Sequence, residues 1–150
     1  MIPLEIKKKE RLVYITDMMQ VLGMQAHLRG YHYLREAICM SVENMELVGS
    51  ITKLMYPEIA KIYHTSNEKV ERAIRSVIEI SWQRGDVILF EEILGYSRIC
   101  GNKRPTNSEF ILAATDKVLL AEKKKLCARV NGGNILTDRK RKVDKGSVDL

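Results

Sequence analysis

The chain has 150 residues, enough for one domain with a buried core. Apolar residues make up 45% and charged residues 29% of it, which excludes a collagen-like, wholly disordered or disulfide-built protein. The formal net charge is +6, but residues 121–150 carry +5 of it, so the first 120 residues are nearly neutral.

The residue types that build catalytic and metal sites lack the spacing that such sites need. Cys39, Cys100 and Cys127 form no Cys-x-x-Cys pair, and the three histidines have no helical zinc-site spacing. No phosphate-binding glycine loop or nucleophile signature occurs, nor any signal peptide or apolar run of about 18 residues. We therefore expect no enzyme, catalytic residue, metal, cofactor or membrane span. Free thiols fit a cytoplasmic protein.

Helical periodicity organises the first third of the chain. Apolar residues at helical spacing predict a helix over 14–22, stopped by Gly23, and a longer one over 31–44. A third segment, 47–55, ends before Pro57, which suits the first turn of a new helix. No alternating pattern is long enough for a sheet. The sequence predicts an all-α domain of six or seven helices.

The next stretch has the layout of a helix-turn-helix. We expect a short helix over 57–63, a turn over 64–67, and a helix over 67–82 that opens with the capping-box spacing Thr65-x-x-Glu68. Small Ala60 would lie where the helices cross. One side of the longer helix is apolar, and the other collects Lys69, Arg72, Arg75, Ser76 and Glu79.

DNA binding is one interpretation of this layout, and an ordinary helical hairpin with a solvated arginine face is the other. The turn lacks the usual glycine, because His64 stands near that place.

Two further helices are expected. One covers 87–94, with Asp86 as N-cap and Gly95 as stop; the adjacent Glu91 and Glu92 form a solvated face or, less simply, a cation site. A loop with a brief extended piece at 96–100 follows, and Thr106-x-x-Glu109 opens the last helix. We divide the chain into an extension (1–14), the helical domain (15–122) and a flexible basic tail (123–150), which is either solubilising or a phosphate-contacting arm.

The sequence of residues 45–86 carries a family resemblance. It reads MELVGSITKLMYPEIAKIYHTSNEKVERAIRSVIEISWQRGD, with HLRGYHYLREAI upstream and LGYS and RPTNSEF downstream. In this order the segments resemble the C-terminal DNA-binding effector domain of the sporulation-initiation response regulator of endospore-forming bacteria, over about residues 15–122. The resemblance implies a compact six-helix effector domain that binds short promoter boxes related to TGTCGAA, as a homodimer on tandem boxes, and regulates early sporulation genes.

The resemblance also implies site residues. Base-reading residues would be Lys69, Glu71, Arg72, Arg75 and Ser76. Arginine can bond guanine as a fork, and glutamate can accept from cytosine N4. Phosphate contacts would come from Thr65, Ser66, Lys103, Arg104 and Asn107. Helix 87–94 would contact the sigma subunit of RNA polymerase through Val87, Phe90, Glu91 and Leu94.

This sequence departs from the family pattern in two ways. The family has arginine at the position of Lys69 and often histidine at that of Ser76, so box preference is expected to differ. The family regulator also carries a receiver domain, whereas about 14 residues precede the effector domain here, so we expect no phosphorylation control in cis. The leading hypothesis is a stand-alone transcription factor. The alternatives are an interaction protein or decoy acting on the full-length regulator or polymerase, and non-specific nucleic-acid binding through the tail.

Overall fold

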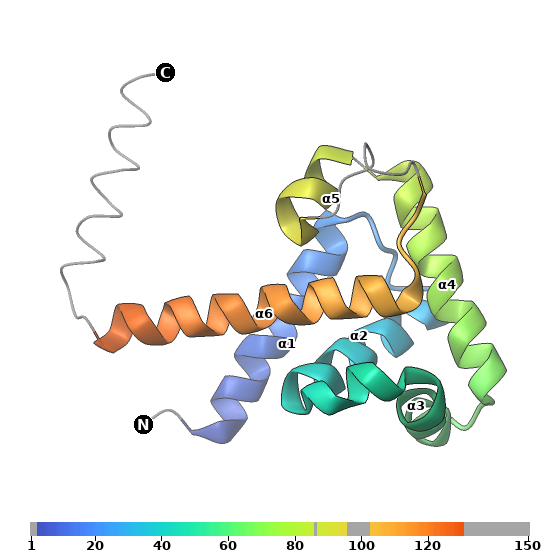
Figure 1. Cartoon of the computed structure of the whole chain (residues 1–150), viewed down its shortest axis with the longest axis horizontal. Coiled ribbons are helices and arrows are strands. Elements are labelled where there is room, and N and C mark those ends of the chain that lie inside the picture. Colours follow the sequence, from blue (N-terminus) through green and yellow to red (C-terminus); the bar gives the residue numbers. More distant parts are fainter. Residues whose placement is uncertain (1–2, 86, 96–102, 131–150) are drawn as a thin grey trace. The chain divides into compact units, whose positions relative to one another are not determined.

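The computed structural model describes residues 3–85, 87–95 and 103–130 (Figure 1). These residues contain no strand, which confirms the all-α prediction. Two irregular helical segments, η1 (Met45–Ser50, 3₁₀) and η2 (Ile51–Met55, π), join the second and third of the α-helices. The α-helices are α1 (Leu4–Val21), α2 (Arg29–Glu43), α3 (Tyr56–Ile62), α4 (Asn67–Arg84), α5 (Val87–Leu94) and α6 (Asn107–Val130).

The chain divides into a compact unit, Met1–Val118, and a second unit, Leu119–Leu150. In the second unit, α6 continues through Lys123, Lys124 and Lys125 to Val130. The prediction of a flexible tail was therefore wrong for residues 123–130, where lysine, leucine, alanine and arginine favour a helix without needing a buried face. The expected N-cap Asp86, the extended piece at 96–100 and the tail at 131–150 lie outside the described residues.

Helix α2 supplies much of the core of the compact unit. It packs against α1, α3 and α4, and its side chains Tyr31, Leu34, Ala37 and Ile38 are at most 1% exposed. Helices α2 and α4 lie close together at Gly30, where a Cβ would overlap the carbonyl group of Ala73 on α4. Glycine is required there because no side chain fits between the two helices.

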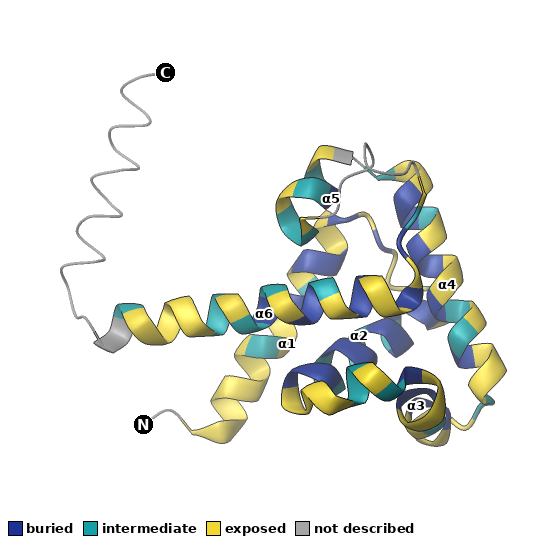
Figure 2. Ribbon diagram, viewed as in Figure 1, coloured by how far each residue is buried: buried dark blue, intermediate teal, exposed yellow. Residues whose placement is uncertain are grey.

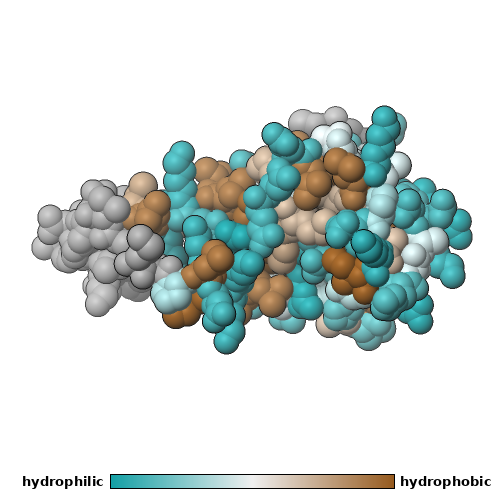
Figure 3. Space-filling model, turned by 90° about the horizontal axis from the view of Figure 1, so that it is seen from below, coloured by the Kyte–Doolittle hydropathy of each residue, from teal (hydrophilic) through white to brown (hydrophobic). Residues whose placement is uncertain are grey.

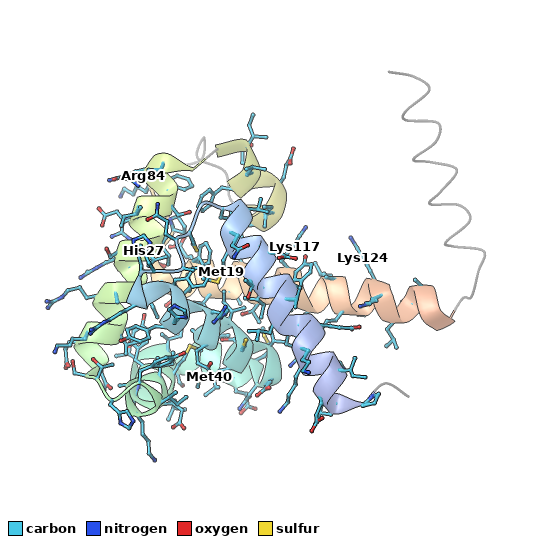
Figure 4. The ribbon with its side chains drawn as sticks, turned by 180° about the vertical axis from the view of Figure 1, so that it is seen from behind. Met19, His27, Met40, Arg84, Lys117 and Lys124 are labelled. Atoms are coloured by element: carbon cyan, nitrogen blue, oxygen red, sulfur yellow. The ribbon has the colours of Figure 1, made fainter. Side chains whose placement is uncertain are left out.

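Helix α1 begins ten residues before the predicted start. Only Ile15, Met18 and Met19 are buried, and residues 3–10 are exposed, so the first turns carry little of the burial pattern that predicts a helix. Met19 lies inside the bundle (Figure 4). Two weak ion pairs, each 3.9 Å long, join Lys8 and Arg11 to Glu43 at the end of α2.

The predicted glycine stops are confirmed. Gly23 has φ +83°, and the amides of Gly23 and Met24 donate to the carbonyls of Gln20 and Met19, which closes α1 in a Schellman motif. Gly95 ends α5 with φ +66°. The face in Figure 3 shows hydrophobic side chains in separate patches among hydrophilic ones, which is ordinary for a domain surface.

Candidate nucleic-acid interface

The turn between α3 and α4 takes its shape from the way in which α3 ends. The amide of Thr65 donates to the carbonyl of Ala60 at 2.9 Å, and His64 has φ +53°. This is the long hydrogen bond of a Schellman motif, with His64 in the left-handed conformation that glycine usually takes. The missing glycine is thus replaced by a strained histidine, and the predicted turn is present.

Ser66, not Thr65, caps the N-terminus of α4. The Oγ of Ser66 accepts from the amide of Lys69 at 3.3 Å. The predicted Thr65–Glu68 capping box was therefore wrong: the cap lies one residue later, because the amide of Thr65 belongs to the end of α3. The Ser66 hydroxyl keeps its own proton, which remains free to donate to an anion.

Helix α4 has one buried and one exposed side (Figure 2). As predicted, Val70, Ile74, Val77, Ile78 and Trp82 are buried. Ala60 on α3 is buried as well. The exposed side carries Lys69, Arg72, Arg75, Ser76 and Glu79. The side chains expected to face DNA therefore project from a helix that its other side fixes to the core.

Glu71 and Arg75 form an ion pair on this surface. Oε1 of Glu71 lies 3.6 Å from Nη1 of Arg75, one helical turn away, and the side chains are 38% and 45% exposed. Such exposed pairs contribute at most about 1 kcal/mol. The pair therefore holds the Arg75 guanidinium over the helix surface. Because the pair contributes so little energy, Arg75 can leave Glu71 and contact DNA instead.

The segment before α6 ends at Asn107, which bonds the backbone of α4. Lys103 is exposed and Arg104 half-buried. Thr106 caps α6, since its Oγ1 accepts from the amide of Glu109 at 3.2 Å and donates to the Glu109 carboxylate at 3.1 Å, as the second capping-box spacing predicted.

Asn107 differs from its predicted role. It is only 9% exposed, and its Nδ2 donates to the hydroxyl of Tyr56 at 2.9 Å and to the backbone carbonyl of Glu71 at 3.1 Å. Both N–H groups of the amide are used, so the prediction that this side chain contacts phosphate was wrong. Burial raises the pKa of Tyr56 above its usual 10.0, which keeps the hydroxyl protonated.

Comparison with known families agrees with this geometry. The family described as "Sporulation initiation factor Spo0A C terminal" matches residues 15–118. The chain belongs to this family. It is thus a sporulation-related DNA-binding effector domain, and the family is one of transcription regulators and not of enzymes.

Within this Spo0A C-terminal fold, α5 departs from the predicted polymerase contacts. Phe90 is 1% exposed and packs edge-on against Trp82, with ring centroids 5.2 Å apart. The prediction that Phe90 contacts polymerase was therefore wrong, because its ring belongs to the core. Glu91 and Leu94 are half-buried, and the side chain of Val87 lies outside the described residues.

Among the α5 side chains that the structure describes, Ile88 is the exposed apolar one, at 61% exposure, and sequence reasoning missed it. Side chains two residues apart on a helix point in directions that differ by about 200°. Because Phe90 points into the core, Ile88 points outward. The hydrophobic sequence VILFEEIL gave no reason to choose which of its residues faces the core.

No group of three His, Cys, Asp or Glu side chains in the described part of the chain could hold a metal ion. No described helix has the length and apolar character needed to cross a membrane.

Proposed function

We propose that this chain is a sequence-specific transcription regulator that places α4 in the major groove and reads short promoter boxes related to TGTCGAA. The observation that carries the proposal is the exposed row of Lys69, Arg72 and Arg75 along the first half of α4. An α-helix fits the major groove, which is about 12 Å wide, and only there are all four base pairs distinguishable.

The exposed side chains divide into base-reading and backbone contacts. Arg72 and Arg75 have the forked donors that bond guanine O6 and N7, and Glu71 can accept from cytosine N4. When α4 enters the groove, Arg75 leaves its ion pair with Glu71 and bonds a base edge instead. Ser76 lies farther along the same side.

Backbone contacts come from around the α4 N-terminus. Thr65 and Ser66 have hydroxyls beside its free amides, where the helix dipole favours an anion. Lys103 and Arg104 would add a second set of phosphate contacts from the segment before α6. Together they would fix the register in which α4 enters the groove.

Fluorescence anisotropy with two matched arginine variants tests this proposal. At about 150 mM salt the wild type is expected to prefer a duplex with tandem boxes over a scrambled duplex by about a thousandfold. Arg72→Ala should lose about 1–3 kcal/mol of this preference. Arg84→Ala is the control, because Arg84 is exposed at the other end of the same helix, about 18 Å further along (Figure 4).

The result that rejects the proposal is equally clear. Equal, salt-sensitive binding to both duplexes would mean that the chain contacts phosphates without reading bases. Equal losses from Arg72→Ala and Arg84→Ala would mean that charge, and not the position on α4, determines binding.

We further propose that α5 contacts the sigma subunit of RNA polymerase, and that two copies bind tandem boxes together. The exposed Ile88 supports the first part, because an apolar side chain at the surface of a helix can be buried by a partner. Ile88→Asp should abolish activation in transcription with purified polymerase while leaving DNA affinity unchanged. A drop in DNA affinity would contradict this assignment.

The same surface supports the second candidate function, an interaction protein or decoy. In that case Ile88→Asp would abolish the regulatory effect whereas Arg72→Ala would leave it intact. For the homodimer, a duplex with two boxes should bind the second copy more tightly than the first, and independent binding of the two copies would contradict it.

A further inference from the structure

Asn107 is a buried polar residue that joins three parts of the effector domain. It is the first residue of α6, and it bonds Tyr56 at the start of α3 and the backbone of Glu71 within α4. The two partners lie 51 and 36 residues away in sequence. The hydrogen bonds are 2.9 and 3.1 Å long, in the ordinary range.

The bond to Glu71 acts on the DNA-facing part of α4. Within a helix, the carbonyl of residue 71 is positioned to accept from the amide of residue 75, and Asn107 adds a second donor from outside the helix. The bonded peptide unit links Glu71 to Arg72, and Arg75 is one turn further. The bond from Asn107 therefore reaches the backbone that carries the predicted base-reading side chains.

The same residue ends the segment that carries the predicted phosphate contacts. Lys103 and Arg104 are followed by buried Pro105 and by Thr106, whose hydroxyl caps α6. Only Pro105 and Thr106 separate Arg104 from Asn107. A short segment fixed by a proline and a cap leaves little freedom between these cations and the bond to α4.

Asn107 combines two satisfied donors with one acceptor that lacks a partner. Its Oδ1 is buried and has no hydrogen-bond partner among the described residues. A buried unsatisfied acceptor is unfavourable, so the favourable polar interactions of this side chain are those of its two donors. The asparagine is thus kept for its two donors.

We propose that Asn107 is a positioning residue for sequence reading, which holds α4 at a fixed depth and rotation relative to the Lys103–Arg104 segment. The inference rests on the proposed function. Base-edge hydrogen bonds need their donors placed within about 0.5 Å. Phosphate contacts by flexible lysine and arginine tolerate more displacement. Loss of the bond therefore lowers binding to the correct boxes and spares non-specific binding.

The test compares Asn107→Leu with Tyr56→Phe in the anisotropy assay. Asn107→Leu keeps the shape and charge of the side chain and removes both donors. Its preference for tandem boxes over the scrambled duplex should fall at least about tenfold, a change of about 1.4 kcal/mol, with affinity for the scrambled duplex unchanged. Tyr56→Phe removes the other acceptor, leaves the bond to α4 in place, and should keep the preference.

A double mutant separates positioning from a general structural role. If Asn107 acts through α4, Asn107→Leu should have little further effect on box preference once Arg72 is alanine, whereas a general structural effect would add to that of Arg72→Ala. Thermal unfolding of each variant checks the fold. Asn107→Ser, whose side chain is too short for both bonds, supplies the same measurement if the leucine variant does not fold.

The outcomes distinguish this inference from the proposed function. A wild type that prefers tandem boxes, with Asn107→Leu and Asn107→Ser retaining that preference, would overturn the inference alone. Parallel losses of affinity for both duplexes, or additivity with Arg72→Ala, would also overturn it. A wild type without box preference would overturn the proposed function and the inference together.

Discussion

Replacing Gly30 with alanine should separate α2 from α4 and destabilise the domain. The added Cβ would lie 2.0 Å from the carbonyl oxygen and 2.6 Å from the carbonyl carbon of Ala73, and 2.7 Å from Cγ2 of Val77. Two of these three atoms belong to the backbone, so the clash cannot be relieved by rotating a side chain. The helices must move apart by roughly 1 Å, which also weakens the surrounding contacts.

The expected cost follows from two opposing effects. Overpacking of this kind costs about 3 kcal/mol when backbone has to move, and the better helix propensity of alanine returns about 1 kcal/mol. The free energy of unfolding should therefore fall by about 2 kcal/mol or more. For a domain near 100 residues this corresponds to a decrease in Tm of about 10 °C.

Urea unfolding followed by circular dichroism measures this effect. Gly49→Ala is the matched control, because a Cβ at Gly49 has no atom within 4 Å and that residue has no positive φ. It should unfold within about 0.5 kcal/mol of the wild type. If the free energy of unfolding of Gly30→Ala also stayed within about 0.5 kcal/mol of the wild type, α2 and α4 could not lie as close together as described.

Three further predictions concern local features of the compact unit. His64→Gly should raise the free energy of unfolding by about 1 kcal/mol, because glycine adopts the left-handed backbone conformation of the turn without strain. A lower free energy of unfolding, measured by urea denaturation, would contradict the assigned turn. Ser66→Ala should lower it by about 1 kcal/mol through loss of the α4 cap, whereas an unchanged value would mean that Ser66 does not cap the helix. Burial, and next the nearby Glu36 carboxylate, raise the pKa of Cys39 to about 11, so little thiolate exists at pH 8 and alkylation should accelerate as the pH approaches 11. Peptide mass mapping should find exposed Cys127 modified before Cys39 at pH 8, and faster labelling of Cys39 would contradict its burial.

The sequence predicted those elements in which burial and periodicity coincide. The apolar side of α4, the exposed row from Lys69 to Ser76 and the stops at Gly23 and Gly95 all follow from residues close together in the chain. The first turns of α1 and the last turns of α6 were missed because they are helical without a regular buried face. Their residues favour a helix through backbone propensity, which a search for buried stripes does not detect.

The site residues that were assigned incorrectly depend on distant contacts. Asn107 is polar and lies at a helix start, which is typical of a phosphate contact, but its amide bonds Tyr56, 51 residues earlier. Phe90 lies in a uniformly hydrophobic helix, and only its packing against Trp82 shows which side is buried. The sequence shows a glycine at position 30 but not why it is needed. The reason is the backbone of Ala73 on another helix, which leaves no room for a side chain.

The most direct test of the account is the ratio of wild-type affinities for the tandem-box and scrambled duplexes, measured by anisotropy at two salt concentrations. If α4 reads bases, the ratio should be about a thousandfold at about 150 mM salt. It should persist when added salt weakens binding to both duplexes, because phosphate contacts are common to the two. A ratio near one at both salt concentrations would contradict the account.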